Sequence, residues 1–145
     1  NTVLPSLEQL FRGPFVNDGK ADRHAQDYVE KIRTKTPNTR ARVGSLSGGN
    51  QQKVVISKWL LRDCDVLIFD EPTRGIDIGA KSEMYDLMAE LAAQGKSIIM
   101  ISSELPELLG MCDRIYVVCE GRINGEIQRK DFTQELVMTY ATGGK

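Results

Sequence analysis

Two kinds of apolar pattern alternate along this sequence. Short apolar runs at residues 66–69 and 97–101 predict β-strands, whereas apolar residues that recur every three or four positions at 21–33, 51–62 and 78–94 predict amphipathic helices. The order strand, helix, strand predicts a βαβ unit, whose two strands are parallel. Because the run at 66–69 is wholly apolar, we expect that strand to be buried on both faces of the sheet.

The end of the chain predicts a hairpin between two short helices. Strands at 113–119 and 122–127 are joined at Glu120-Gly121, which is typical of a tight turn. Helices are expected at 104–110 and 131–140, the second one capped by Asp131 or Thr133.

The start of the chain predicts helices separated by polar loops. A short helix at 6–12 precedes a turn at Asp18-Gly19, and a polar loop at 35–42 follows the helix at 21–33. Each longer helix carries an apolar stripe that we expect to be buried, and we interpret Trp59 as a core residue because it lies within one. The stripes are Ala25, Tyr28, Val29 and Ile32; Val55, Ile56, Trp59 and Leu60; and Tyr85, Leu87, Met88 and Leu91.

Composition narrows the class of protein. The 145 residues are 41% hydrophobic and 27% charged, which is typical of a globular domain with a core. A net charge of -1 gives no basic footprint for nucleic acid. The apolar runs are far shorter than the ~20 residues of a membrane span. The three cysteines lack metal-ligand spacing, and we interpret them as reduced thiols.

The segment LSGGNQQK at residues 46–53 predicts a loop that turns into a helix. Ser47 is a suitable N-cap, and the helix that follows has no internal Gly or Pro. A helix start offers free N–H groups to an anion, and Gly48 and Gly49 let a phosphate approach the backbone closely. The alternative is an ordinary capped helix after a flexible loop.

Two carboxylates follow the first predicted strand. Asp70 and Glu71 stand at the carboxyl end of the apolar run, where ligands bind in open α/β sheets. An aspartate that faces magnesium and a glutamate that polarises an attacking water have this arrangement in phosphoryl transfer. The pair is therefore a candidate for hydrolytic chemistry next to the candidate phosphate-binding helix.

Together these segments resemble the nucleotide-binding domain of ABC ATPases. LSGGNQQK is similar to their signature motif, residues 66–71 to their Walker B strand, and PTRGID at 72–77 to their D-loop. The resemblance implies an α/β fold, a partial P-loop NTPase domain with a helical subdomain at 1–62 and the Walker B/D-loop half of the ATPase core at 63–145. The sequence begins with Asn1 and contains no phosphate loop of the form G-x-x-x-x-G-K-[ST]. We therefore expect the carboxyl-terminal part of such a domain.

The form of the motifs points to one branch of that family. Asn50 stands where most signatures have Gln, Thr73-Arg74-Gly75 replaces the common D-loop residues, and Ser103 stands where the family normally has a histidine. These features resemble the second nucleotide-binding domain of the bacterial ATPases that drive uptake of ribose, galactose, xylose and similar monosaccharides.

The resemblance implies a role for each motif residue. ATP would lie between this domain's signature and the phosphate loop of the first domain, Asp70 would hold Mg²⁺, and Glu71 would be the general base. Asp77 caps the helix at 78–94 and would also help join the two nucleotide sites, while Ser103 caps a helix, contacts phosphate, or does both. The expected ATP-binding residues are Ser47, Gly48, Gly49, Asn50, Asp77 and Ser103.

The resemblance also implies partners and a location. They are the first nucleotide-binding domain of the same polypeptide, transmembrane permease subunits and, indirectly, a periplasmic sugar-binding protein, at the cytoplasmic face of the bacterial inner membrane. The leading hypothesis is an ATP-hydrolysing part of a sugar importer. The alternative is a catalytically degenerate module that completes the partner domain's ATP site and docks the permease, which the serine at position 103 favours slightly.

Overall fold

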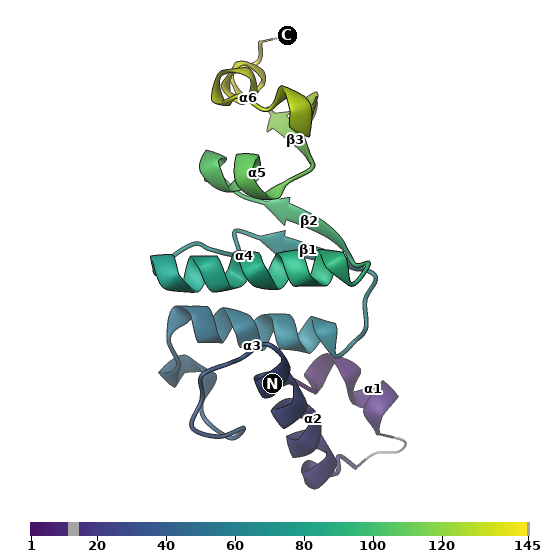
Figure 1. The fold of residues 1–145 in the computed structure, drawn as a ribbon. Helices are drawn as coiled ribbons and strands as arrows, with labels where there is room; N and C mark the ends of the chain where they lie inside the picture. The colour runs from purple at the N-terminus through teal and green to yellow at the C-terminus, as the bar shows by residue number, and fades with distance from the viewer. Residues whose placement is uncertain (12–14, 145) are drawn as a thin grey trace. The chain divides into compact units, whose positions relative to one another are not determined.

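A computed structural model describes residues 1–11 and 15–144 (Figure 1). The chain forms two compact units, one made of Asn1–Ile68 with Pro72–Ile99 and the other of Phe69–Glu71 with Met100–Lys145. The sequence suggests a boundary between a helical subdomain at 1–62 and half of the ATPase core at 63–145, and this boundary stays a prediction. Arg12 and Lys145, which belong to predicted segments, lie outside the described residues.

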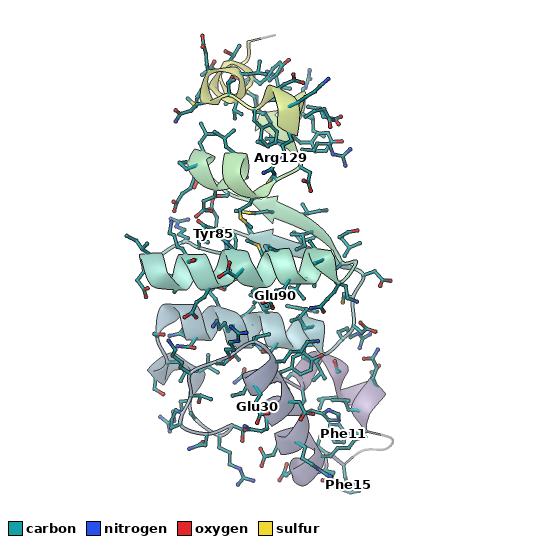
Figure 2. All side chains as sticks on the ribbon, in the orientation of Figure 1. Phe11, Phe15, Glu30, Tyr85, Glu90 and Arg129 are labelled. Atoms are coloured by element: carbon teal, nitrogen blue, oxygen red, sulfur yellow. The ribbon has the colours of Figure 1, made fainter. Side chains whose placement is uncertain are left out.

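The first unit is mainly helical. Figure 1 shows two of its helices, α3 and α4, side by side. Phe11 is buried near the amino-terminal helices, whereas Phe15 is exposed (Figure 2). The elements are η1 (Leu4–Ser6), α1 (Leu7–Leu10), α2 (Asp18–Lys31), η2 (Val43–Ser45), α3 (Gly48–Leu60) and α4 (Ile78–Ala93), with the first residues of β1 (Val66–Asp70) and β2 (Ser97–Ile101).

Helix α2 begins earlier than the sequence suggested. The predicted turn at Asp18-Gly19 is wrong, because both residues lie in the first turn of α2. The Asn17 side chain accepts a hydrogen bond from the Lys20 N–H at 2.9 Å and so caps the helix there. The amphipathic pattern is confirmed: Ala25, Tyr28 and Val29 are partly buried and Ile32 is 5% exposed, and the Tyr28 hydroxyl donates to the Leu60 carbonyl at 3.0 Å.

Helix α3 buries a different face from the predicted one. Ile56 and Leu60 are buried as expected, but Val55 is 43% exposed and Trp59 is 51% exposed, so the expectation that these two lie in the core is wrong. Two polar residues take the buried positions instead, because their polar atoms find partners. Ser57 donates to the Lys53 carbonyl at 2.9 Å, and Lys53 joins an ion pair with α4.

The two short strands β1 and β2 pair in parallel, which confirms that part of the βαβ prediction. In the first unit the Ser97 N–H donates to the Asp65 carbonyl, and in the second the Glu71 N–H donates to the Ile101 carbonyl, each at 2.9 Å. The expectation that β1 is buried on both faces is wrong. Its burial alternates, with Leu67 inside and Ile68 66% exposed, as in a sheet that is covered on one face only.

The second unit is a hairpin packed against helices. Strands β3 and β4 are antiparallel with an irregularity at Val117/Val118, which confirms the predicted hairpin, and Thr133 caps α6 as one of the two expected residues. Its core contains Ile115, Val117, Ile127 and Val137. After β1 and β2 the elements are α5 (Leu105–Met111), β3 (Arg114–Cys119), β4 (Arg122–Gln128), η3 (Arg129–Asp131) and α6 (Gln134–Ala141).

Within the described residues, none of the helices combines the length and the apolar character that crossing a membrane requires.

Candidate functional site

The amino end of α3 leaves several hydrogen-bond donors free. Ser47 occupies the N-cap position, as predicted, and the first intrahelical bond runs from the Gln51 N–H to the Ser47 carbonyl at 2.9 Å. The N–H groups of Gly48, Gly49 and Asn50 therefore have no acceptor within the helix. The Ser47 side chain makes no capping bond to them. This helix end consequently presents three N–H groups and the positive end of the macrodipole to an anion.

The Ser47 hydroxyl has a different partner. The Asn50 amide nitrogen donates to Ser47 Oγ at 2.8 Å, and the Asn50 amide oxygen accepts from the Lys35 N–H at 2.7 Å. Both ends of the Asn50 amide are thus engaged within the protein. Ser47 is exposed, so its hydroxyl remains accessible to a ligand.

The two glycines of the motif differ in their surroundings. A Cβ on Gly49 would lie 2.7 Å from the Ala80 Cβ, and Gly49 is buried against α4. A Cβ on Gly48 would lie 3.3 Å from Ile76 Cγ2, and Gly48 is exposed. Close approach to a phosphate was the reason inferred from the sequence for both glycines. The structure adds a packing reason for Gly49 that the sequence did not indicate.

Asp77 caps α4 beside this helix end. Its Oδ1 accepts from the Ala80 N–H at 2.9 Å, which confirms the predicted cap. Ile76 and Ala80, which flank Asp77, are the residues nearest to Gly48 and Gly49. The first unit therefore brings the signature-like segment at 46–53 and the D-loop-like segment at 72–77 together, although 18 residues separate them in the sequence.

An ion pair joins α3 to α4 one turn further along. Lys53, 5% exposed, donates through Nζ to Glu83 Oε2 at 2.6 Å and to the Arg33 carbonyl at 3.2 Å. Lys35 Nζ lies 3.6 Å from the other Glu83 oxygen. The hydrogen bond from Lys53 and its charge, with a smaller contribution from Lys35, lower the pKa of Glu83 below its ordinary value.

The second unit contains the two carboxylates predicted at the strand end. Asp70 is exposed at the last position of β1, and Glu71 follows with φ of +47°, a left-handed conformation that is uncommon for glutamate. Two backbone groups from the end of β2 hold Glu71. Its N–H donates to the Ile101 carbonyl at 2.9 Å, and its Oε1 accepts from the Ser103 N–H at 3.0 Å.

Ser103 does not cap a helix. The predicted cap is wrong, because α5 begins at Leu105 with Glu104 in the N-cap position. Ser102 binds this helix start instead: its Oγ accepts from the Glu104 N–H and donates to Oε2 of the buried Glu107, both at 3.0 Å. Sequence reasoning missed Ser102 and Glu107. The available signal was a serine five residues before a glutamate at the start of a predicted helix, which fits a local side-chain network.

The described residues include no group of three or more His, Cys, Asp and Glu side chains that could hold a metal ion by themselves. A single carboxylate at a strand end suits Mg²⁺ nonetheless, because Mg²⁺ is usually held by one or two carboxylates together with water and substrate phosphates. The exposed Asp70 carboxylate fits that requirement.

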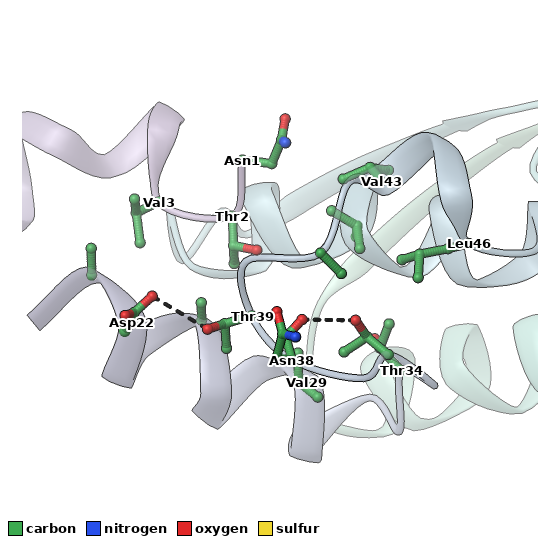
Figure 3. A pocket seen from close by; sticks show the side chains of 15 residues that line it. Asn1, Thr2, Val3, Asp22, Val29, Thr34, Asn38, Thr39, Val43 and Leu46 are labelled. Carbon is green, nitrogen blue, oxygen red and sulfur yellow. Dashed lines mark hydrogen bonds between the residues drawn. The ribbon is translucent and has the colours of Figure 1, made fainter. Parts of the chain in front are cut away.

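A cavity of about 140 Å³ lies in the first unit under the loop between α2 and η2 (Figure 3). Asp22 on α2 accepts hydrogen bonds from the Thr39 hydroxyl at 3.3 Å and from Arg40 Nη2 at 2.8 Å. These bonds hold the loop against α2 beside the cavity. The hydrogen bond from Arg40 lowers the pKa of Asp22. Leu46, at the start of the signature-like segment, also lines the cavity.

Comparison with known proteins decides the family. The sequence profile of the ABC transporter family matches residues 2–74. The chain belongs to the ABC transporter family. It is 55% identical over all 145 residues to the xylose import ATP-binding protein XylG of Thermoanaerobacter pseudethanolicus, and it covers 29% of that protein. The chain therefore spans less than a third of the length of this relative.

Solved ABC cassettes have the same fold. A post-hydrolysis dimer of the ATP-binding cassette MJ0796 with ADP and Pi is 20% identical, with a TM-score of 0.69 over 87% of this chain and 54% of that one. The ATP-binding cassette MJ1267 is 24% identical, with a TM-score of 0.74 over 97% of this chain and 55% of that one. The predicted fold class, a partial α/β cassette of the P-loop NTPase type, is confirmed.

The Gly49→Ala variant tests the packing of this ABC cassette. The added methyl would meet the Ala80 Cβ at 2.7 Å, so α3 and α4 must separate. We expect a loss of about 1–3 kcal/mol in the free energy of unfolding from overpacking, offset by up to about 1 kcal/mol of helix propensity. Urea unfolding measures the loss.

Gly48→Ala is the matched control, and its loss should be smaller because Ile76 Cγ2 is the nearest atom at 3.3 Å. Ala80→Gly should restore part of the stability lost in Gly49→Ala. Strictly additive effects of the two substitutions would contradict the proposed contact.

The Glu83→Gln variant tests the ion pair. It leaves the buried Lys53 ammonium without a counter-charge, and we expect a loss of about 1–2 kcal/mol at neutral pH, toward the low end because the Glu83 side chain is 47% exposed. Since the pKa of Glu83 is lowered on folding, its contribution is complete above about pH 5 and disappears as the pH falls through the lowered value.

Chemical unfolding of both proteins between neutral and acid pH measures this difference. Glu90→Gln, on the same helix (Figure 2), is the control and should leave the stability nearly unchanged. A stability difference between wild type and Glu83→Gln that persists unchanged into strong acid would exclude the ion pair as its source.

Proposed function

We propose that this chain is the carboxyl-terminal part of the second nucleotide-binding domain of an ATP-hydrolysing subunit of a bacterial monosaccharide importer. The observation that carries this proposal is the amino end of α3, where Gly48, Gly49 and Asn50 have free N–H groups beside an exposed Ser47 hydroxyl. Such an end suits the terminal phosphate of a nucleotide. Identity of 55% to a xylose import ATP-binding protein supports sugar uptake as the process.

The signature acts in trans on a partner's nucleotide. The helix end supplies donors to an ATP that the first nucleotide-binding domain holds, and membership of the ABC transporter family supports this pairing of two domains. Ser47, Gly48 and Gly49 bind the γ-phosphate there. The contact of Gly49 with Ala80 supports a companion role for Asp77, because it keeps the D-loop against the same helix end.

The carboxylates of the second unit serve the other nucleotide site. Asp70 holds Mg²⁺, which when bound neutralises charge on the phosphates, and its exposed carboxylate suits that ion. Glu71 accepts a proton from the attacking water. Its carboxylate is oriented by the Ser103 N–H, so Ser103 contributes through its backbone and presents its exposed hydroxyl to phosphate.

The cycle of ATP binding and hydrolysis then moves transmembrane permease subunits, to which a periplasmic sugar-binding protein delivers the sugar. The protein is peripheral, at the cytoplasmic face of the inner membrane. The family membership supports this arrangement.

A second candidate function is a coupling module that completes the partner domain's site without hydrolysing at its own. One observation favours it: at position 103 the side chain is a neutral hydroxyl, and the contact with Glu71 comes from the backbone N–H. A serine donates a hydrogen bond to phosphate but carries no positive charge.

Ser47→Arg in the full-length polypeptide tests the trans role of the signature. The long cationic side chain would fill the space in front of the free N–H groups, and we expect ATP hydrolysis to fall by at least about 10²-fold. Ser45→Arg, which adds the same side chain two residues earlier on an exposed position, should retain most of the activity. Undiminished hydrolysis by Ser47→Arg would exclude this function for α3.

Glu71→Gln in the full-length polypeptide separates the two candidate functions. If Glu71 is a working general base, hydrolysis should fall by about 10²-fold or more while nucleotide binding is retained. Near-normal hydrolysis and import in this variant would instead establish the coupling module. Asp65→Asn, an exposed acid before β1, is the control for loss of charge alone.

A further inference from the structure

The Asn50 side chain has an orientation that its partners determine. One end of the amide meets the Lys35 backbone N–H at 2.7 Å, and the other meets Ser47 Oγ at 2.8 Å. A backbone N–H can only donate, so the amide oxygen must face Lys35. The amide nitrogen is then forced toward Ser47, and it can only donate to the hydroxyl oxygen.

The Lys35 N–H that imposes this orientation is itself fixed. Helix α2 ends in a Schellman motif: Arg33 has φ of +53° and donates to the Glu30 carbonyl at 3.1 Å, and the Thr34 N–H donates to the Val29 carbonyl at 2.8 Å. Lys53 also binds the Arg33 carbonyl at 3.2 Å.

The chain beyond Lys35 is held as well. Asp22 receives hydrogen bonds from two residues of the loop that follows, from Thr39 (Figure 3) and from Arg40. The donor that sets the orientation of Asn50 therefore stands between two anchored points of the backbone.

The orientation of the Asn50 amide determines where the hydroxyl proton of Ser47 can be donated. Because the hydroxyl oxygen accepts from Asn50, and because the side chain makes no capping bond to α3, the hydroxyl proton is available to an external acceptor. A hydroxyl that accepts one hydrogen bond is a stronger donor in the next. The Ser47 proton is thus presented beside the free N–H groups of Gly48 and Gly49.

We propose that Asn50 is a positioning residue that holds the Ser47 hydroxyl as a donor to the terminal phosphate. This inference rests on the proposed function and deepens it: the Asn50 side chain does not touch the nucleotide but sets the direction of the Ser47 proton. It also accounts for Asn in place of the common Gln. A longer side chain would displace the amide by about one C–C bond, ~1.5 Å, from partners at 2.7 and 2.8 Å.

Two substitutions in the full-length polypeptide test the proposal. Asn50→Ala removes the donor, and we expect kcat for ATP hydrolysis to fall about tenfold with little change in KM. Asn50→Asp keeps the shape and the oxygen that faces Lys35 but replaces the donor by an acceptor. The Ser47 proton would then turn toward residue 50, and we expect a larger loss, about 10²-fold.

A double variant at residues 47 and 50 tests whether Asn50 acts through the Ser47 hydroxyl. If Asn50 acts through the hydroxyl, Asn50→Ala should have little further effect in a Ser47→Ala background. Gln94→Ala, which removes an exposed amide side chain at the carboxyl end of α4, is the matched control and should leave kcat nearly unchanged. Thermal unfolding of every variant should stay within a few degrees of wild type, since the bonds involved are exposed.

The results distinguish the positioning role of Asn50 from the function of the signature itself. Multiplicative losses in the double variant, or a loss in Asn50→Ala no greater than in Gln94→Ala, would overturn the positioning role of Asn50. The signature function would stay intact if Ser47→Arg is still inactive. Full activity of Ser47→Arg would overturn the proposed function itself. A fall in unfolding temperature that parallels the loss of kcat would mean that Asn50 has a structural role only.

Discussion

The close approach of α3 to α4 is the constraint on which the first unit depends. Gly49 permits it, because any side chain there would collide with Ala80 at 2.7 Å. One turn further on, the buried Lys53 ammonium meets Glu83 on α4, which fixes the two helices along their length. The helix register then determines that Asp77, which caps α4, and Ser47, which precedes α3, begin their helices side by side. The signature-like segment, which the sequence marks as a candidate phosphate-binding helix end, is therefore also a helix-packing motif.

In the second unit the comparable constraint is the backbone at Glu71. A non-glycine residue with φ of +47° costs on the order of 1 kcal/mol, and such strain persists only where the surroundings impose it. Hydrogen bonds from the Ser103 N–H and to the Ile101 carbonyl supply that restraint. The Ser102–Glu107 bond fixes the turn that carries Ser103. The orientation of the candidate base thus depends on main-chain groups more than on the identity of residue 103.

Features that depend on neighbours in sequence were predictable, and features that depend on distant partners were not. The Asp77 and Thr133 caps and the Glu120-Gly121 turn follow from local rules and are confirmed. The exposure of Trp59 was mispredicted because periodicity ranks residues by hydrophobicity. It could not reveal that Lys53 would be buried by a partner thirty residues away. Motif resemblance identified the candidate site residues, but it could not supply the contact of Asn50 with Lys35, which depends on how α2 ends.

The N-cap residues of this chain differ in whether the side chain stabilises the start of its helix or stays available to a ligand. Asn17, Asp77 and Thr133 each accept a hydrogen bond from an N–H in the first turn of their helix, a bond worth about 1 kcal/mol. Ser47 occupies the same position on α3, yet its side chain makes no such bond. A capping bond would occupy one of the free N–H groups and turn the hydroxyl toward the helix. By binding Ser47 from the side, Asn50 keeps both kinds of donor available, so α3 forgoes a capping bond at an end where a bound anion can supply the stabilisation instead.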